Sequence, residues 1–166
     1  MHFMDAKSAI KETFGLSNMV LNSYIGDLTD AELLRRPGAG CNHVAWQLGH
    51  LISSECGLMN GIQAGAAPKL PDGFEAKHSK ENTASDQASD FCTKQEYLDL
   101  AGKVHEAVIA LLDSYPEHKL DEPSPEHFRS MFPTMGSMFI LIATHSMMHA
   151  GQIVPIRREL GKPVVI

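Results

Sequence analysis

The recurrence of apolar residues at intervals of three and four, over four long segments, constrains the fold of this chain most strongly. That spacing puts the apolar side chains on one face of an α-helix, so each segment predicts an amphipathic helix facing a core. No segment alternates polar and apolar residues regularly enough to predict a strand. We therefore expect an all-α protein. The four predicted helices run from about Asp5 to Ile25, from after the cap Asn42 to beyond Met59, from Thr93 to about Tyr115, and from about Thr134 to Leu160.

Residues that begin and end helices stand at the borders of these segments. Asp5 is a suitable N-cap, because its carboxylate can accept a hydrogen bond from a free backbone amide of the first turn. Thr29–Glu32 and Thr93–Glu96 both have the form of a capping box. The first of them predicts a short additional helix that ends at Pro37, and Gly161–Pro163 predicts the end of the last helix.

The stretch Gln63–Asp90, between the second and third long helices, is polar and rich in Gly, Pro, Ser and Lys. Neighbouring antiparallel helices are usually joined by about 2–8 residues. A connection this long favours a four-helix bundle with a crossover between helices two and three. With 166 residues, the chain is long enough for one buried core and too short for two ordinary domains, so residues 1–166 are expected to form a single domain.

Composition argues against two classes of partner. The formal net charge is −6, and the longest basic clusters are the pairs Arg35–Arg36 and Arg157–Arg158, so nucleic-acid binding is not expected. The longest apolar stretch, Met138–Thr144, is far shorter than the roughly 20 residues that cross a bilayer, and no signal peptide is recognisable. The cytoplasm is the expected location. The three cysteines are widely spaced and are expected as free, buried or half-buried thiols: Cys41, Cys56 and Cys92.

Two histidines of the last helix, His145 and His149, are spaced four residues apart. Such residues share one helix face with Cβ atoms about 5–6 Å apart, so both imidazoles can reach one metal ion. Chance alone predicts about half of one such pair in a chain with 9 His among 166 residues. The pair follows the apolar run Phe139–Ile142, where a buried imidazole needs partners for its ring nitrogens. From the residues alone, a metal site and a hydrogen-bonded core pair explain it equally well.

A third ligand should come from another helix, and His50 lies among apolar residues in the middle of the second one. Trp46, one turn earlier on the same face, would wall a pocket, although plain core packing explains it as well. Gly49 would allow a neighbouring group to approach closely, at a cost of about 1 kcal/mol relative to Ala. His43 is expected to be exposed or to cap the helix, and His105 to be a core histidine. The histidines of the termini and loops receive no role: His2, His78, His118 and His127.

Two segments resemble those of a known family. Residues 42–51, NHVAWQLGHL, resemble the second-helix signature of the DinB-like (DinB/YfiT) metalloproteins. Residues 145–153, HSMMHAGQI, followed by residues 157–163, resemble its last-helix signature, HxxxHxGQ. The long connection after the second helix also matches the family layout. Ala150 departs from the pattern, because a basic residue is common at that position, and we expect no anion recognition there.

The resemblance implies that His50, His145 and His149 are the ligands of a three-histidine site, which usually holds zinc, nickel or a similar divalent ion. It also implies an up-down-down-up four-helix bundle that is often a homodimer. Characterised relatives include transferases that use low-molecular-weight thiols and a thiol-dependent isomerase. A small-molecule substrate and a thiol cosubstrate are therefore the expected partners.

Three neutral imidazoles leave a divalent ion with its full charge and an open position, which is the arrangement of catalytic rather than structural zinc. Such an ion lowers the pKa of bound water to about 7 or holds a thiol as thiolate. These properties, with the resemblance, predict a metal-dependent thiol transferase. A metal-dependent hydrolase is the neighbouring alternative. A non-catalytic, metal-stabilised and stress-associated bundle is a further one, in which a fourth side chain such as His43 or His105 closes the site.

A zincin protease is disfavoured, because Ser146 follows His145 where the HExxH motif has its glutamate. Glu55 is five residues past His50, roughly 140° around the helix, and is poorly placed as a general base. The catalytic residues are therefore not identified. Gln152, one turn after His149, is expected to line the pocket or support a ligand, with helix packing an equally good explanation.

Overall fold

The computed structural model describes residues 4–164, so His2 lies outside the described residues. The described chain forms six α-helices: α1 (Ala6–Ile25), α2 (Asp30–Leu33), α3 (Val44–Ile62), α4 (Phe74–Lys77), α5 (Lys94–Ser114) and α6 (Met135–Glu159). Three short 3-10 turns are added: η1 (Lys80–Asn82), η2 (Ala88–Asp90) and η3 (Glu117–Lys119). Residues 4–164 contain no strand, only an isolated bridge between Pro123 and Thr134. The prediction of an all-helical protein is confirmed.

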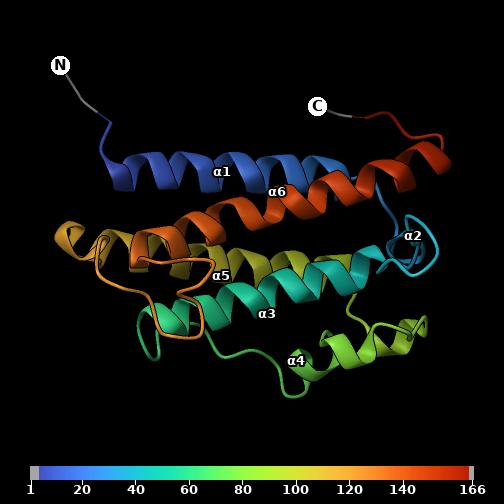
Figure 1. Cartoon of the computed structure of the whole chain (residues 1–166). Coiled ribbons are helices and arrows are strands. Elements are labelled where there is room, and N and C mark those ends of the chain that lie inside the picture. The colour runs from blue at the N-terminus through green and yellow to red at the C-terminus, as the bar shows by residue number, and fades with distance from the viewer. Residues whose placement is uncertain (1–3, 165–166) are drawn as a thin grey trace.

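The four long helices lie alongside one another, with α1 next to α6 and α3 next to α5 (Figure 1). Followed along the colour ramp, α1 and α6 run in one direction and α3 and α5 in the other (Figure 1). Because α3 and α5 run the same way, the connection between them must return along the length of both helices. This connection contains α4, η1 and η2, so it is more ordered than its polar composition suggests.

The predicted helix starts are largely confirmed. Asp5 caps α1 by accepting a hydrogen bond from the Ser8 amide at 2.7 Å. Thr29–Glu32 and Thr93–Glu96 both form complete capping boxes at the starts of α2 and α5. The short helix α2 ends at Leu33 and does not reach Pro37. The last helix is followed by Gly161 at φ 68°, a left-handed conformation that glycine adopts without strain.

The start of α3 differs from the prediction, because its N-cap is His43 and not Asn42. Nδ1 of His43 accepts a hydrogen bond from the Trp46 amide at 3.0 Å, and Nε2 lies 3.1 Å from the Ser85 carbonyl oxygen. The ring is fully buried, in T-shaped contact with Phe91. An imidazole can act as this cap because its acceptor nitrogen replaces the usual side-chain oxygen, and the crossover supplies a partner for the other nitrogen.

The buried apolar side chains of the four long helices and of α2 and α4 form one hydrophobic cluster. Cys56 belongs to it, and burial raises the pKa of its thiol to about 11, so the thiolate is disfavoured. Cys92 is half-buried, as expected. The expectation for Cys41 is wrong, because this cysteine is exposed in the turn before α3.

Helix α6 is the described helix whose length and composition would suffice to cross a membrane. It packs against α1 and α3, and Ser146, His149 and Arg157 are among its buried residues. Arg157 is 1% exposed, and its guanidinium donates to the Asp27 carboxylate at 2.5 Å and to the Tyr24 carbonyl at 2.6 Å. These bonds attach the end of α6 to the end of α1.

Candidate metal centre

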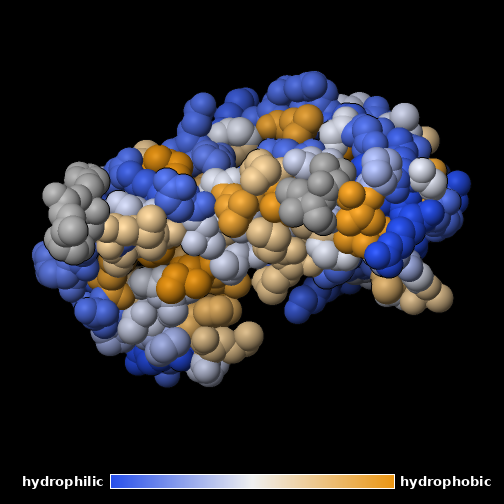
Figure 2. All heavy atoms as spheres, turned by 90° about the horizontal axis from the view of Figure 1, so that it is seen from above, coloured by the Kyte–Doolittle hydropathy of each residue, from blue (hydrophilic) through white to orange (hydrophobic). Residues whose placement is uncertain are grey.

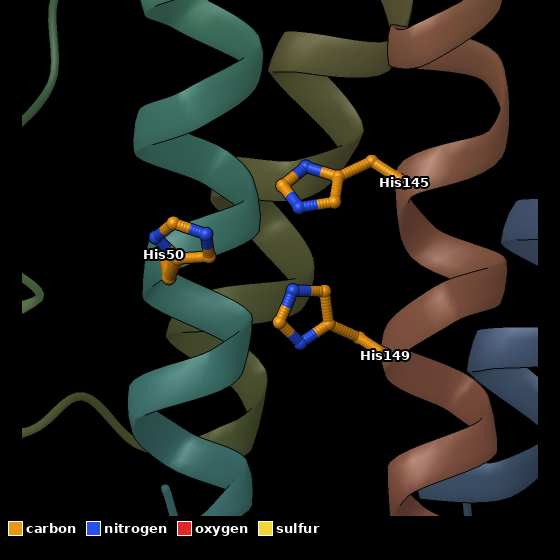
Figure 3. Close-up of side chains that lie close together, drawn as sticks. All are labelled: His50, His145 and His149. Carbon is orange, nitrogen blue, oxygen red and sulfur yellow. The ribbon is translucent and has the colours of Figure 1, made fainter.

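Three histidines converge between α3 and α6. His50 points from α3, and His145 and His149 point from successive turns of α6, into the same space (Figure 3). One ring nitrogen of each can be chosen so that all three nitrogens lie within 4.8 Å of one another. The ring centroids are 5.4, 5.5 and 4.9 Å apart, which makes the arrangement nearly an equilateral triangle. Because metal–nitrogen bonds are about 2.0–2.1 Å long, a shift of the side chains by a fraction of this spacing would place one ion among the three.

His149 is oriented by a residue that the sequence analysis does not single out. Its Nδ1 lies 2.9 Å from the side-chain oxygen of Gln47, which is 1% exposed on α3. The Gln47 amide nitrogen donates to the Asn42 carbonyl at 2.8 Å, so the amide oxygen faces the imidazole. Since that oxygen can only accept, Nδ1 of His149 carries the proton and Nε2 has a free lone pair. The sequence feature that could have pointed to Gln47 is its polarity, because it lies within an apolar stretch, three positions before His50.

His145 provides the observation that tests whether these residues suit a cation. Its Nδ1 is buried and has no hydrogen-bond partner among the described residues. A buried polar atom without a partner costs about 1–3 kcal/mol. The second ring nitrogen of His145 points toward His149 (Figure 3), so the ring offers a donor to the space that the three imidazoles share, and this donor set fits a divalent cation. Three imidazoles are also the ligand set of known catalytic zinc sites.

The electrostatics of the cluster favour neutral imidazoles. Burial lowers the pKa of His145 to about 4, with a smaller contribution from the charge of His50. Burial also lowers the pKa of His149 to about 4, aided by His145 and His50. The pKa of His50 is lowered by burial and then by the positive charge of Lys80. At neutral pH the three rings are therefore unprotonated and retain the lone pairs that a metal requires.

Trp46 and Gly49, both close to His50 in the sequence, each make a close contact with a neighbouring ring. The indole of Trp46 stacks on His50 with ring centroids 4.9 Å apart and an interplanar angle of 8°, and its Nε1 donates to the Ser79 carbonyl at 3.1 Å. The expected close approach at Gly49 is present, and the approaching group is the His78 ring. His78 is buried, and its ring nitrogens contact the Phe74 carbonyl at 2.8 Å and the Tyr97 hydroxyl at 2.7 Å. His78 thus joins the crossover to α3 and α5.

The other two helical histidines lie outside the cluster. Both ring nitrogens of His43 are engaged in capping α3, as described above. His105 stacks on Phe14 with centroids 4.6 Å apart and lines a different cavity. Among residues 4–164, no further His, Cys, Asp or Glu joins the three-histidine group. No fourth side chain closes the centre in the described chain, and this favours an open position.

A groove of about 850 Å³ opens beside the cluster and has both His50 and His145 in its wall. Met148 of α6 also lines it. Trp46 is not part of its wall, since it lies against His50. Gln152 is exposed on α6 and lines neither this groove nor the cavity around Glu55, so its expected place in a pocket is not observed.

Glu55 faces away from the cluster, as its position on the helix predicts. It is buried beside a separate cavity of about 460 Å³ that is bordered by residues of α1, α3 and α5. Burial raises the pKa of its carboxyl group to about 8, and a hydrogen bond from Ser146 offsets part of the effect. Glu55 is therefore mostly protonated at neutral pH, and it is not positioned to act on a ligand of the three histidines.

Comparison with known proteins gives one family and one fold. The model of the DinB superfamily matches residues 14–153, a range that contains all three histidines. A crystal structure of a conserved protein from Enterococcus faecalis superposes with a TM-score of 0.72, at 19% sequence identity, over 96% of this chain and 100% of that chain. At this identity the likeness concerns the fold alone. No match was found among curated proteins.

Proposed function

This chain belongs to the DinB superfamily, and we propose that it is a metal-dependent enzyme whose His50, His145 and His149 hold one divalent ion, zinc or nickel. The observation that carries the proposal is the convergence of three neutral imidazoles, two of which, His50 and His145, also line a groove. A structural site would need a fourth protein ligand, and none is present among the described residues.

We further propose that the reaction is the transfer of a low-molecular-weight thiol to a small electrophilic substrate. A bound divalent ion would supply a Lewis acid that favours thiolate near neutral pH. In this reaction the sulfur forms a bond to an electrophilic carbon, the leaving group departs with the electrons of the broken bond, and the thiol proton passes to solvent. The role of Gln47 and Trp46 is to hold His149 and His50 in fixed orientations.

Further proposals concern the assembly and its surroundings. The directions of the four long helices support an up-down-down-up bundle of the DinB type (Figure 1). We propose that the protein acts in the cytoplasm as a homodimer and does not bind nucleic acid, in keeping with a net charge of −6. Analytical ultracentrifugation of the untagged protein tests the dimer, and a single monomeric species at all concentrations would refute it.

The first experiment is elemental mass spectrometry on untagged protein, because an affinity tag would itself bind metal. The wild type should contain close to one zinc or nickel per chain, and His145→Ala should lose it. His105→Ala is the matched control, since His105 lies on a long helix outside the cluster and its loss should leave the metal content unchanged.

Two results would overturn the proposal in different ways. A wild type that stays free of metal after incubation with zinc or nickel would remove the metal centre altogether. Loss of metal in His43→Ala, at the level of His145→Ala, would show a closed and therefore structural site. If metal is present, thiol transfer to an aryl halide is assayed with glutathione and cysteine. Ester hydrolysis without thiol transfer would instead identify a hydrolase.

A further inference from the structure

The groove beside the three histidines is the most apolar concave surface near the candidate site. Its wall is formed mainly by apolar side chains of α3, of α6 and of the segment 121–134 that precedes α6. Those used in the argument below are Leu58, Phe128, Met131, Ile140 and Met148. Its volume of about 850 Å³ falls within the range of about 300–1,000 Å³ typical of small-molecule sites.

Solvent-exposed apolar side chains gather at this groove. Met131 is 76% exposed, and Ile140 and Met148 are each 53% exposed, so three of the chain's largest exposed apolar groups share one wall. Figure 2, a view from above, shows hydrophobic residues in separate patches among hydrophilic ones on that face. Leaving such surface in water is unfavourable by about 25 cal/mol per Å², so a partner that covers it would gain that free energy.

The groove has a positive charge at one end only. Lys80 is the only Asp, Glu, Lys or Arg side chain in its wall. The Lys80 ammonium forms neither an ion pair nor a hydrogen bond with any residue from 4 to 164, and its charge reaches His50. A divalent ion held by His50 and His145 would add further positive charge at the same end. The groove wall thus combines mainly apolar side chains with one positive charge that acts on the candidate metal centre.

We infer that this groove binds an organic anion with an extended apolar body, such as a medium-chain or aryl carboxylate, with its carboxylate toward Lys80 and its apolar part along Leu58, Phe128 and Ile140. The inference rests on the proposed function, because it identifies the chemical class of the electrophilic substrate, which would carry its leaving group on such an anionic, apolar skeleton. The simple carboxylates used below are non-reacting probes of that skeleton. Polar groups are disfavoured next to Leu58, Phe128 and Ile140, since they would lose hydrogen bonds to water without replacement there.

A small molecule suits this surface better than a second copy of the chain. The surface is hollowed, whereas homodimer interfaces pack two complementary patches of about 800 Å² each against one another. The Lys80 ammonium also favours an anion beside the apolar side chains of the wall, and a carboxylate on an apolar body matches both features. A second chain in the groove is nevertheless an outcome that the test below detects.

Isothermal titration calorimetry of the full, untagged chain tests this inference, with chelator-treated and zinc-loaded protein in parallel. The probes are hexanoate, octanoate and decanoate, with decanamide as the neutral and decylamine as the cationic analogue. Affinity should rise about fourfold for each added methylene, as expected for burial of about 0.8 kcal/mol per methylene. Decylamine should bind at least tenfold more weakly than decanoate, because Lys80 and the zinc ion repel it.

Variants separate the two features of the groove. Lys80→Met should weaken decanoate binding about fivefold or more and leave decanamide binding unchanged. Lys69→Met is the matched control, because Lys69 is also exposed but lies outside the groove wall, and it should bind like the wild type. Ile140→Asp should weaken both ligands. Lys80 and Ile140 are solvent-exposed, so these variants should fold, which circular dichroism checks.

Binding that is independent of chain length, or unchanged in Lys80→Met, would overturn the inference. Conversion of a dimer to a monomer by Ile140→Asp in analytical ultracentrifugation would also overturn it, since a second chain would then cover the groove. Metal in the wild type without decanoate binding refutes the inference and leaves the metal centre standing. Chain-length-dependent and Lys80-dependent binding to a protein that never takes up metal supports the groove and refutes the proposed function.

Discussion

Replacing Gly49 by Ala should unfold this protein far more easily, although alanine is the better helix former. A Cβ atom at this position would lie 2.0 Å from Cδ2 and 2.2 Å from Nε2 of His78, where ordinary contact distances are about 3.5–4.0 Å. The His78 ring has little freedom to move aside. It is 2% exposed, its Nδ1 lies 2.8 Å from the Phe74 carbonyl, and its Nε2 lies 2.7 Å from the Tyr97 hydroxyl.

The magnitude follows from three contributions to the free energy of unfolding. Overpacking of a tight core costs about 1–3 kcal/mol. Displacing the His78 ring breaks at least one buried hydrogen bond, and an unsatisfied partner costs about 1–3 kcal/mol. The helix propensity of alanine returns about 1 kcal/mol. We therefore expect Gly49→Ala to lower the free energy of unfolding by about 1–5 kcal/mol.

Urea denaturation followed by circular dichroism measures the change. Gly57→Ala is the matched control, because Gly57 lies on the same helix and a Cβ added there would meet no neighbouring atom within 4 Å, and it should raise stability by about 0.5–1 kcal/mol. In a His78→Ala background the Gly49→Ala change should become neutral or stabilising, since the obstructing ring is gone. If Gly49→Ala is as stable as Gly57→Ala, the proposed contact between α3 and the crossover is refuted.

Two further predictions concern the polar groups around the core. Gln47→Leu should lower zinc affinity by about 10–100-fold in competition with a chelator, because His149 loses the acceptor of its Nδ1 proton; unchanged affinity would show that Gln47 does not orient the ligand. The pKa of Glu55, raised by burial to about 8, means that the folded state holds its proton more tightly than the unfolded chain. The contribution of the Glu55 proton to the stability of the folded state is therefore complete below the unfolded pKa of about 4.5. That contribution is lost as the pH rises to about 8. Glu55→Gln should be no less stable than the wild type at acidic pH and more stable by a few kcal/mol at about pH 8, and denaturation curves with equal pH dependence for both proteins would contradict this.

The helices and most of their ends could be predicted because the interactions that specify them are local. Apolar spacing along α1 and α6, and the hydrogen bonds of Thr29 and Thr93 within their capping boxes, involve residues no more than four positions apart. His43 was predicted only in part, as a residue that is either exposed or caps the helix. Its cap bond to the Trp46 amide is local, but its burial depends on the Ser85 carbonyl, 42 positions away, and no local pattern contains that information.

The candidate site also has features that local sequence predicts and features that depend on distant residues. The spacing of His145 and His149 on one helix face is a property of the sequence, and their family resemblance extends to His50. The bond between Gln47 and His149 spans 102 positions, and the contact of His78 with Gly49 joins the crossover to α3. Sequence patterns assign neither residue a role, because each acts through a partner that is distant in the chain.

By itself, the sequence determined an all-helical chain, the borders of its long helices and a histidine set with the spacing of metal ligands. Only the tertiary structure decided that α3 and α6 face each other with the three imidazoles between them, and that a groove with Lys80 at one end opens beside them. The physical reason is that helix formation depends on neighbours within one or two turns. The position of a groove depends instead on how the helices pack, and that follows from the burial of apolar side chains throughout the chain.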